Sequence, residues 1–278
     1  MVKGIVNKII PFSSVDGPGN RLAIFLQGCN FDCLNCHNPE TINHCLNCGI
    51  CTPSCPTPAL EIKDQKVIWK PTDCVACDLC VKKCPYNSTP KTTALSVDEM
   101  LTQIAPVKGF LSGVTVSGGE CTLQKDFLIE LGAAVKNLGL TFFIDTNGST
   151  DFELNPKLTD AFDMAMLDVK SIDADEHFKL VKHTHETVLK NLKYLAKIGK
   201  LYEVRTVIIP NVLDNERNVR EISQLIAEFA PSVRYKLIKY RPLGVRKNLI
   251  DSHTPSEETM QHLKSIAIAN GCEQVITI

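Results

Sequence analysis

Residues 29–36 read Cys-Asn-Phe-Asp-Cys-Leu-Asn-Cys, so three cysteines stand at the spacing C-x3-C-x2-C. A four-iron cluster takes four ligands, and three thiolates leave one iron with an open position that a small molecule can fill. The alternative interpretation is a zinc site that borrows a remote ligand such as His37 or His44. Because two longer cysteine runs of the iron-sulfur type follow directly, we favour an iron-sulfur cluster at this loop.

Two longer cysteine runs have the form C-x2-C-x2-C-x3-C-P and lie at residues 45–56 and 74–85. Each matches the run of bacterial ferredoxins, in which the fourth cysteine binds the other cluster of the pair. We therefore expect two [4Fe-4S] clusters, the first held by Cys45, Cys48, Cys51 and Cys84 and the second by Cys74, Cys77, Cys80 and Cys55. A module this small buries little core of its own, so the clusters would supply much of its folding energy.

These two runs form a repeat that lies inside a longer domain. Residues 41–43 and 87–90 flank the repeat, and their polar and proline content suits crossings between two units. We expect a small ferredoxin-like insert at residues 42–90 and one discontinuous domain made of residues 1–41 and 91–278.

Composition indicates a cytoplasmic enzyme. The chain has 278 residues, of which 44% are hydrophobic, and this is enough for a substantial core. Its formal net charge of −1 favours neither nucleic acid nor a membrane surface as a partner. No apolar stretch approaches the roughly 18 residues of a spanning helix, and the first twenty residues lack the apolar region of a signal peptide. All but two of the 13 cysteines, Cys121 and Cys272, fall in the three runs, and we interpret these two as small buried hydrophobes.

Strand-like and helix-like segments alternate along the discontinuous domain. The expected strands are 22–26, 113–116, 140–144, 164–169, 202–209 and 233–239, and the expected helices are 96–104, 123–138, 186–197, 215–229 and 256–269. Ser96 is the expected cap of the first of these helices, because Glu99 follows three residues later. This alternation is typical of a parallel sheet with right-handed crossovers. Periodicity alone leaves both an open sheet and a barrel possible.

Polar motifs follow the ends of the expected strands. Residues 118–120, Gly-Gly-Glu, follow the second strand, Asp145 ends the third, and Asp168 and Lys170 end the fourth, while Arg205 lies in the fifth. Because the carboxyl ends of parallel strands meet at one edge, we expect these residues around one ligand site. A glycine pair lets the backbone approach a ligand closely, although Gly-Gly-Glu alone would also suit an ordinary turn. The two aspartates alone would suit two surface carboxylates.

The segments VDGPGNR at 15–21, FLQGC at 25–29 and CHNPE at 36–40 resemble the signature of glycyl radical enzyme activases within the radical S-adenosylmethionine superfamily. The resemblance implies an α/β fold with a partial (β/α)6 barrel, and it implies that Cys29, Cys33 and Cys36 hold the catalytic cluster. In that family S-adenosylmethionine chelates the open iron and an electron enters its sulfonium group. The 5'-deoxyadenosyl radical that is released then takes a hydrogen atom.

The resemblance also implies roles for the polar motifs. Gly118, Gly119 and Glu120 would run alongside the methionyl amino group of S-adenosylmethionine. Asp145 and Asp168 would supply a monovalent cation site beside the substrate carboxylate, for which hard oxygen ligands are suitable. Lys170 and Arg205 would face the methionyl carboxylate, which Arg205 suits by its bidentate geometry.

Three positions depart from the family pattern. Cys121 stands where the family usually has proline, and Asn35 stands where it often has an aromatic residue that packs at the adenine. The segment that begins at Tyr240 and Arg241 lacks a histidine that activases often carry there. We interpret His37 as a structural polar residue of the cluster loop, because hydrogen-atom abstraction needs no base.

We therefore expect an activase that generates a glycyl radical on a separate partner enzyme. It would use three [4Fe-4S] clusters, S-adenosylmethionine and a monovalent cation. The insert is expected to relay electrons from a flavodoxin-like or ferredoxin-like donor, or to dock a partner. One alternative is a radical enzyme that acts on a small molecule or peptide, and a second is a two-cluster electron carrier with a degenerate barrel.

Overall fold

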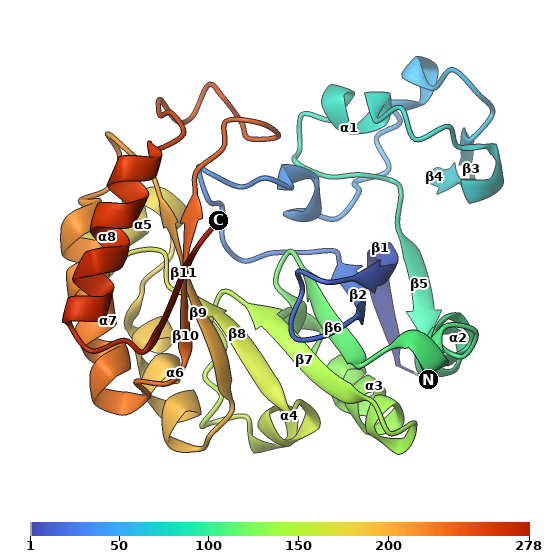
Figure 1. Cartoon of the computed structure of the whole chain (residues 1–278). Helices are drawn as coiled ribbons and strands as arrows, with labels where there is room; N and C mark the ends of the chain where they lie inside the picture. The colour runs from blue at the N-terminus through green and yellow to red at the C-terminus, as the bar shows by residue number, and fades with distance from the viewer. Residues whose placement is uncertain (1) are drawn as a thin grey trace.

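The computed structural model describes residues 2–278. Within them, a nine-stranded sheet has the strand order β11-β10-β9-β8-β7-β6-β2-β1-β5 (Figure 1). The strands from β11 to β2 in this order are parallel neighbours, whereas β1 pairs antiparallel with both β2 and β5. The bounds are β1 Lys3–Ser13, β2 Arg21–Leu26, β5 Thr93–Ser96, β6 Gly113–Gly118, β7 Thr141–Thr146, β8 Met164–Asp168, β9 Leu201–Ile208, β10 Arg234–Lys239 and β11 Gln274–Thr277.

The parallel part of the sheet agrees with the sequence prediction. All the expected strands are present as β2 and β6 to β10, and their ends differ from the expected ones by no more than about two residues. Strands β1, β5 and β11 were not expected. Strand β1 shows no clear alternation of buried and exposed residues, and β5 and β11 are short strands at the two edges of the sheet. Edge strands carry a weak periodic signal because neighbours cover only one of their sides.

Helices follow most strands and lie beside them in Figure 1. Their bounds are α2 Val97–Ile104, α3 Lys125–Asn137, α4 Pro156–Ala161, α5 Ala174–Val181, α6 Glu186–Lys197, α7 Asn215–Phe229 and α8 Glu257–Ala269. The predicted cap of α2 is confirmed, because the Glu99 N–H donates to the Ser96 hydroxyl and the Ser96 N–H donates to the Glu99 carboxylate. Helix α3 begins later than predicted, since residues Cys121–Gln124 form a 3-10 turn. Helices α4 and α5 were missed. No helix in residues 2–278 is both long enough and apolar enough to cross a membrane.

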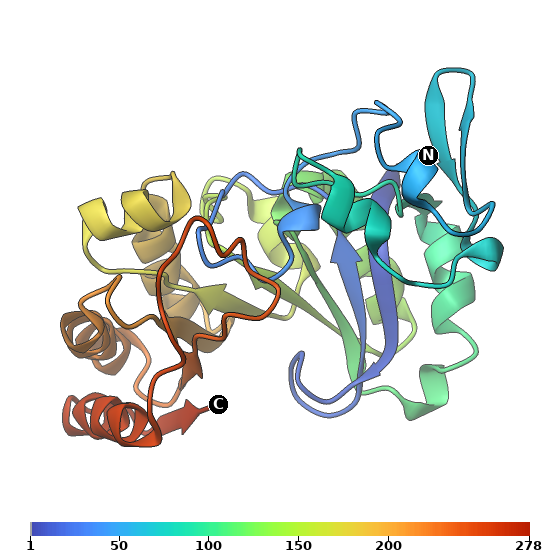
Figure 2. The same ribbon diagram turned by 90° about the horizontal axis from the view of Figure 1, so that it is seen from above.

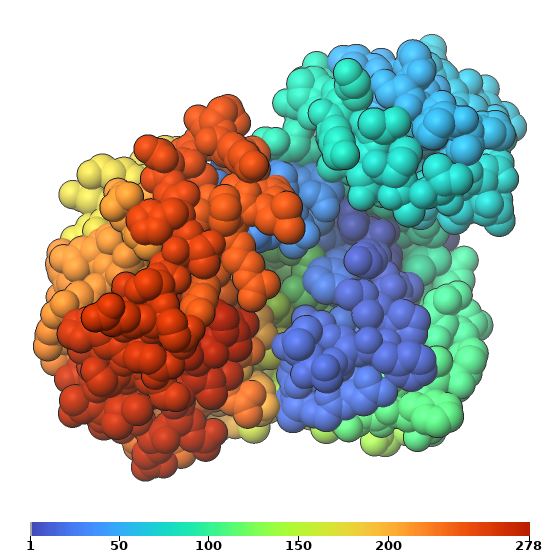
Figure 3. Space-filling view, turned by 45° about the horizontal axis from the view of Figure 1, so that its top comes forward, coloured from blue at the N-terminus to red at the C-terminus, as the bar shows by residue number. Residues whose placement is uncertain are grey.

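The segment that carries the two longer cysteine runs forms a small unit beside β1 and β2, drawn in blue to teal in Figure 1 and standing out at the upper right of Figure 3. It contains the antiparallel hairpin of β3 Leu60–Lys63 and β4 Lys66–Trp69, the short helix α1 Leu79–Lys83, and the 3-10 turns Thr52–Ser54 and Pro71–Asp73. Its buried cluster is small and consists of Cys51, Leu60, Val67 and Cys80. This cluster is distinct from the main core between the sheet and the helices.

The small unit joins the sheet next to the first cysteine run. The Gly28 N–H donates to the carbonyl of Thr41 (2.8 Å), and the Cys29 N–H donates to the carbonyl of Ile42 (2.9 Å). The two ends of the unit also meet each other, since the Asn43 N–H donates to the carbonyl of Asn87 (3.0 Å). The backbone around Cys29 and the entry to residues 42–90 are therefore fixed relative to each other.

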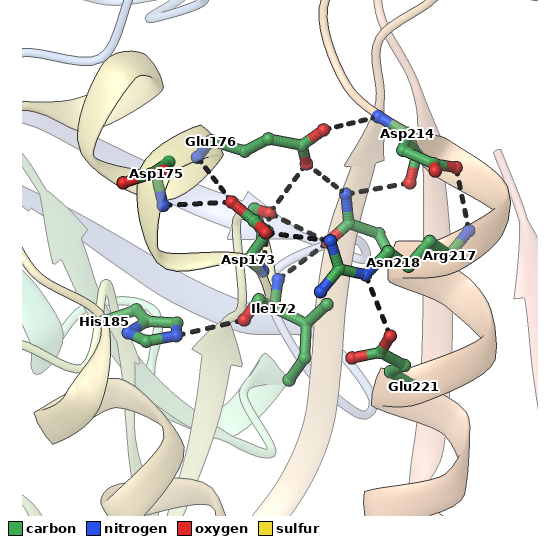
Figure 4. Close-up of polar contacts among 10 residues, drawn as sticks. Ile172, Asp173, Asp175, Glu176, His185, Asp214, Arg217, Asn218 and Glu221 are labelled. Carbon is green, nitrogen blue, oxygen red and sulfur yellow. Dashed lines mark hydrogen bonds and ion pairs between the residues drawn. The ribbon is translucent and has the colours of Figure 1, made fainter.

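A polar network fastens α5 to α7 (Figure 4). The Asn218 carboxamide oxygen accepts from the Ile172 N–H (2.7 Å), while its amide nitrogen donates to Glu176 (2.9 Å). Asp173 caps α5 by accepting from the N–H of Glu176 (2.9 Å), and Arg217 pairs with the same aspartate (2.8 Å). These contacts fix the turn between β8 and α5.

The far end of α5 in turn supports the first cysteine run. The N–H groups of Asp32 and Leu34 donate to the carbonyls of Val181 (3.0 Å) and Leu180 (2.8 Å). His177 of α5 is fully buried and packs edge-on against Phe31, with ring centroids 5.8 Å apart. Burial, reinforced by the neighbouring His185, lowers the pKa of His177 from 6.5 to about 4.

The buried His177 predicts a stability that falls in mild acid. The unfolded chain binds a proton at this residue near pH 6.5 but the folded chain only near pH 4, so the free energy of unfolding decreases as the pH falls between these values. From about pH 7 to about pH 5, we expect His177 to account for a loss of roughly 2 kcal/mol. Urea unfolding at the two pH values measures this loss, which His177→Phe should largely remove. The matched replacement His253→Phe, at an exposed histidine, should leave the pH dependence unchanged. An equal loss of stability in wild type and His177→Phe would contradict the prediction.

Candidate functional site

A cavity of about 310 Å³ lies at the carboxyl ends of the parallel strands. Its lining includes the predicted residues Cys29, Cys33, Cys36, Gly118, Gly119, Asp145, Asp168, Lys170 and Arg205. These residues come from the loop after β2 and from strands β6 to β9 or the turns that follow them. Figure 3 shows a hollow in the face between the blue N-terminal part and the orange C-terminal part of the molecule. The structure therefore brings together side chains that are far apart in the sequence, as the strand-end argument predicts.

The three thiols of residues 29–36 belong to one short loop on the cavity wall. The Phe31 N–H points at the Cys29 sulfur (3.4 Å), and the Cys36 N–H donates to the carbonyl of Cys33 (3.1 Å). Burial raises the pKa of Cys29 and of Cys33 to about 12 each, and the ammonium group of Lys170 opposes the rise at Cys33. Burial likewise raises the pKa of Cys36. Without a metal these thiols keep their protons, so metal binding at the loop must release them.

Two ion pairs occupy the opposite wall of the cavity. Lys170 Nζ lies 2.6 Å from Asp168, and Arg205 Nη1 lies 2.8 Å from Asp145. Burial raises the pKa of Asp145, and the Arg205 charge opposes this rise. Burial alone would lower the pKa of Lys170, but the negative groups around it, Asp168 foremost, together outweigh burial and the pKa is raised. Lys170 and Arg205, which the sequence analysis predicts to face a ligand carboxylate, are thus paired here with Asp168 and Asp145, which it predicts to bind a cation.

Glu203 is a buried member of this site that the sequence analysis missed. Its carboxylate pairs with Arg205 Nε (2.6 Å) and with Lys236 Nζ (2.8 Å), and its side chain is 1% exposed. A charged residue inside a strand of otherwise apolar neighbours was the available signal, since β9 reads Leu-Tyr-Glu-Val-Arg from residue 201. A buried carboxylate needs a partner, and Glu203 has one in Arg205. The Arg205 guanidinium is therefore held by two carboxylates, Glu203 at Nε and Asp145 at Nη1.

The carboxylate of Glu120 is directed into the turn after β6. One carboxylate oxygen accepts from the Thr122 N–H (3.0 Å), the Thr122 hydroxyl (2.6 Å) and the Thr146 hydroxyl (2.8 Å). The other accepts from the Asn147 N–H (2.7 Å). Burial raises the pKa of Glu120, and these donors oppose the rise. The carboxylate therefore joins the turns after β6 and β7, and the neighbouring glycines line the cavity.

Glycine is required at Gly118 and Gly119 by close backbone contacts. Gly118 has a φ of +124°, and a Cβ there would lie 2.2 Å from the backbone of Leu26. A Cβ on Gly119 would lie 2.1 Å from the carbonyl oxygen of Gly28. The glycine pair thus lets the turn after β6 lie directly against the backbone that leads into Cys29.

The structure shows the surroundings of the positions that depart from the family pattern. Asn35 is buried and lines the cavity, and its Oδ1 has no hydrogen-bond partner among residues 2–278. Cys121 is fully buried, and its thiol contacts the carbonyl of Asp145 (3.4 Å). Cys272 is also buried, so the interpretation of both cysteines as buried hydrophobes is confirmed.

Tyr240 is buried near the ring of His37, and the His37 Nε2–H donates to the carbonyl of Arg241 (3.0 Å).

The signature arginine has a structural place. Arg21 is fully buried at the start of β2, and its guanidinium lies 4.1 Å from the ring centre of Phe143. It donates to the Thr115 hydroxyl (2.6 Å) and to the carbonyl of Val114 (2.8 Å). Burial lowers the pKa of Arg21 to about 10, so the side chain remains a cation at neutral pH. The residue ties β2 to β6 and β7 at the ends of these strands that lie away from the cavity.

The eight cysteines of residues 42–90 surround two small hollows. Cys45, Cys48, Cys51 and Cys84 line one hollow, and Cys55, Cys74, Cys77 and Cys80 line the other. No three Cys, His, Asp or Glu side chains within residues 2–278 converge on a position for a single metal ion.

A family profile and two named relatives match most of this chain. The sequence profile of the Radical SAM superfamily matches residues 23–222. The chain is 29% identical over 250 residues to a pyruvate formate-lyase-activating enzyme of Streptococcus mutans, covering 87% of this chain and 80% of that protein. It is 28% identical over 295 residues to a putative glycyl-radical enzyme activating enzyme of Haemophilus influenzae, covering 98% and 96%.

Solved structures share the fold. A domain of a pyruvate-formate lyase-activating enzyme from Bacteroides vulgatus superposes with a TM-score of 0.53 at 24% identity, covering 60% of this chain and 99% of that one. QueE from Escherichia coli superposes with a TM-score of 0.55 at 13% identity, covering 99% and 94%. Because the family profile spans residues 23–222, which is well over half of the sequence, the chain belongs to the Radical SAM superfamily.

Proposed function

We propose that the protein is a glycyl radical enzyme activase. The observation that carries the proposal is the loop of Cys29, Cys33 and Cys36 on the wall of a cavity whose other wall holds Lys170 and Arg205. Relatives named as activating enzymes match over most of the chain. The substrate would be a glycine in a separate glycyl radical enzyme.

The residues of the cavity fit a [4Fe-4S] cluster and S-adenosylmethionine, the cofactors that the superfamily implies. Three thiols on one loop would hold three irons and leave the fourth open. The cavity volume of about 310 Å³ lies in the range of small-molecule sites. The unpartnered Oδ1 of Asn35 is an acceptor available to a bound ligand. When bound, the cluster and S-adenosylmethionine supply the electron and the carbon radical that removes a hydrogen atom.

The charged wall would orient the methionyl end of the cofactor. Lys170 and Arg205 would bind its carboxylate, and the Gly118–Gly119 backbone would line its amino group. Asp145 and Asp168 would then be released from their present partners to bind a monovalent cation. Glu203 would keep Arg205 in place through this exchange, because it pairs with Arg205 and does not itself line the cavity.

Residues 42–90 would hold two further [4Fe-4S] clusters, which makes three in the chain. The grouping of the cysteines around two hollows supports this proposal, because it places Cys84 with the first run and Cys55 with the second. The two runs also share their backbone shape, since Asn47 and Ala76, at equivalent positions, both have positive φ angles of 58° and 53°. We assign the ferredoxin-like insert to 42–90 and a partial (β/α)6 barrel to 1–41 and 91–278. The insert would pass electrons from a flavodoxin-like or ferredoxin-like donor to the Cys29 loop.

The first expected result concerns metal content. Anaerobically reconstituted protein should contain three clusters, or about twelve irons per chain. Replacing Cys29, Cys33 and Cys36 together by alanine should remove about four irons, while Cys121→Ala should remove none. Iron and sulfide analysis measures both values. Saturation of the wild type near four irons, or stoichiometric zinc, would count against the assignment.

A second expected result separates cofactor cleavage from electron supply. Replacing Cys45 and Cys74 by alanine should damage both insert clusters and leave the Cys29 loop intact. Cleavage of S-adenosylmethionine with dithionite should then largely survive, whereas cleavage driven by reduced flavodoxin should fall much further. If both activities fall equally while the barrel stays folded, the relay is wrong and the insert has a structural role.

A third expected result identifies the hydrogen donor. A glycine α-carbon is suitable because the radical is delocalised over the flanking peptide groups and no side chain blocks approach. A partner enzyme deuterated at its glycine α-carbons should therefore transfer deuterium into 5'-deoxyadenosine and retain a glycine-centred radical, which mass spectrometry and electron paramagnetic resonance detect. Unlabelled 5'-deoxyadenosine at full turnover, without a protein radical, would favour a small-molecule or peptide substrate.

A further inference from the structure

The segment between β10 and α8, residues 240–256, lies across the first cysteine run. We call this segment the strap. It is the orange-red loop that extends from the C-terminal part of the molecule towards the blue segment that follows β2 in Figures 1 and 2. Val245 and Ile250 are buried in the main core and anchor the strap, whereas Leu243 between β10 and these anchors is 82% exposed.

Arg246 is the contact of the strap with the cysteine loop. Its Nη2 donates to the carbonyl of Cys33 (2.8 Å) and pairs with the carboxylate of Asp32 (2.6 Å). The Arg246 side chain is 13% exposed, but the Asp32 side chain is 52% exposed. Arg246 Nε is buried and has no hydrogen-bond partner within residues 2–278. The guanidinium therefore has one buried N–H for which the described polypeptide supplies no acceptor.

A second contact lies on the other side of Cys36. The carbonyl of Arg241 accepts from His37, and Gly244 of the strap has a φ of +85°. A Cβ on Gly244 would approach the carbonyl oxygen of His37 to 3.0 Å. The strap therefore lies against residues on both sides of Cys36. On its opposite side the loop is held by α5, through the bonds from Asp32 and Leu34 to the end of that helix.

Arg246 and Asp32 differ in how strongly water screens their charges. Water screens an exposed carboxylate more than a mostly buried guanidinium, so the positive charge of Arg246 dominates at the cysteine loop. A positive charge beside an iron-sulfur cluster favours the reduced state, which carries one more negative charge.

We propose that Arg246 is a positioning residue that holds the Cys29–Cys36 loop in place and raises the reduction potential of the cluster bound there. This inference rests on the proposed cluster site. The reduction adds one electron to the cluster, taken from an external donor such as dithionite or a reduced flavodoxin-like protein, with no bond made or broken in Arg246. Cleavage of S-adenosylmethionine requires the reduced cluster. The strap makes that cluster easier to reduce.

The test is a redox titration of reconstituted protein, followed by electron paramagnetic resonance. The relevant cluster is the one whose signal changes when S-adenosylmethionine is added. In Arg246→Gln, we expect the ratio of reduced to oxidised cluster at a fixed potential to fall about tenfold, which is about 59 mV for a one-electron couple. Arg246→Lys should retain most of the wild-type potential, because it keeps the charge. Asp32→Asn should shift the potential upward by a smaller amount, because it removes a negative charge and leaves Arg246 in place.

Lys247→Gln is the matched control, since it removes the same charge from the next residue of the strap, where the side chain is exposed. Its potential should remain that of the wild type. Equal shifts in Arg246→Gln and Lys247→Gln, or shifts of the same sign in Arg246→Gln and Asp32→Asn, would overturn the proposal. If Arg246→Gln fails to assemble the cluster, an unchanged potential in Asp32→Asn would overturn it and an upward shift would support it.

The same titration separates this inference from the proposed function. A wild-type protein without any cluster signal that responds to S-adenosylmethionine would overturn the cluster site, and the role of Arg246 with it. A responsive signal whose potential does not depend on residue 246 would overturn only the role of Arg246.

Discussion

Arg205 is buried at the centre of the cavity wall, and a buried cation is stable only when carboxylates surround it. Asp145 and Glu203 meet this requirement from two strands, β7 and β9, and Lys236 of β10 completes the pairing of Glu203. Strands β7, β9 and β10 are consequently joined by ion pairs as well as by the backbone hydrogen bonds of the sheet. The pair with Glu203 holds Arg205 in position whatever Asp145 binds, and a charge fixed in this way needs little reorganisation when a ligand binds.

The opposite wall is held by different means. The cysteine loop contains short-range turns only, and its position depends on what lies around it: the end of α5 on one side, the strap on the other, and the backbone of Thr41 and Ile42 below Cys29. Figure 4 shows that α5 itself is fastened to α7 through Asn218. The geometry of the loop is therefore set by elements that lie far from it in the sequence, and a change in α7 or the strap will reach the thiols through these contacts.

Patterns in the sequence were sufficient for the parallel strands and for the convergence of their polar ends, because both follow from local periodicity and from the geometry of parallel sheets. They were insufficient where the tertiary partner decides the outcome. Glu120 is an example, since the fold brings Thr146 and Asn147 at the end of β7 to its carboxylate. Glu203 is another, since its position in an expected strand marks it as unusual but does not identify Lys236 of β10 as its partner. Strands β5 and β11 were missed because they are short and lie at the edges of the sheet, and β1 was missed because its residues show no clear alternation of burial.

The role of the strap is hard to infer from the sequence alone. Residues 240–256 contain no regular periodicity, and Arg246 would be interpreted from sequence alone as one of a pair of solvated cations with Lys247. In the fold the two diverge, since Arg246 reaches the Cys33 carbonyl and Lys247 is exposed. A potential that depends on a single charge in a loop can be adjusted without altering the thiols or the strands. The strap, which contacts the cysteine loop, is therefore where the ease of reduction can vary while the chemistry of the site is kept.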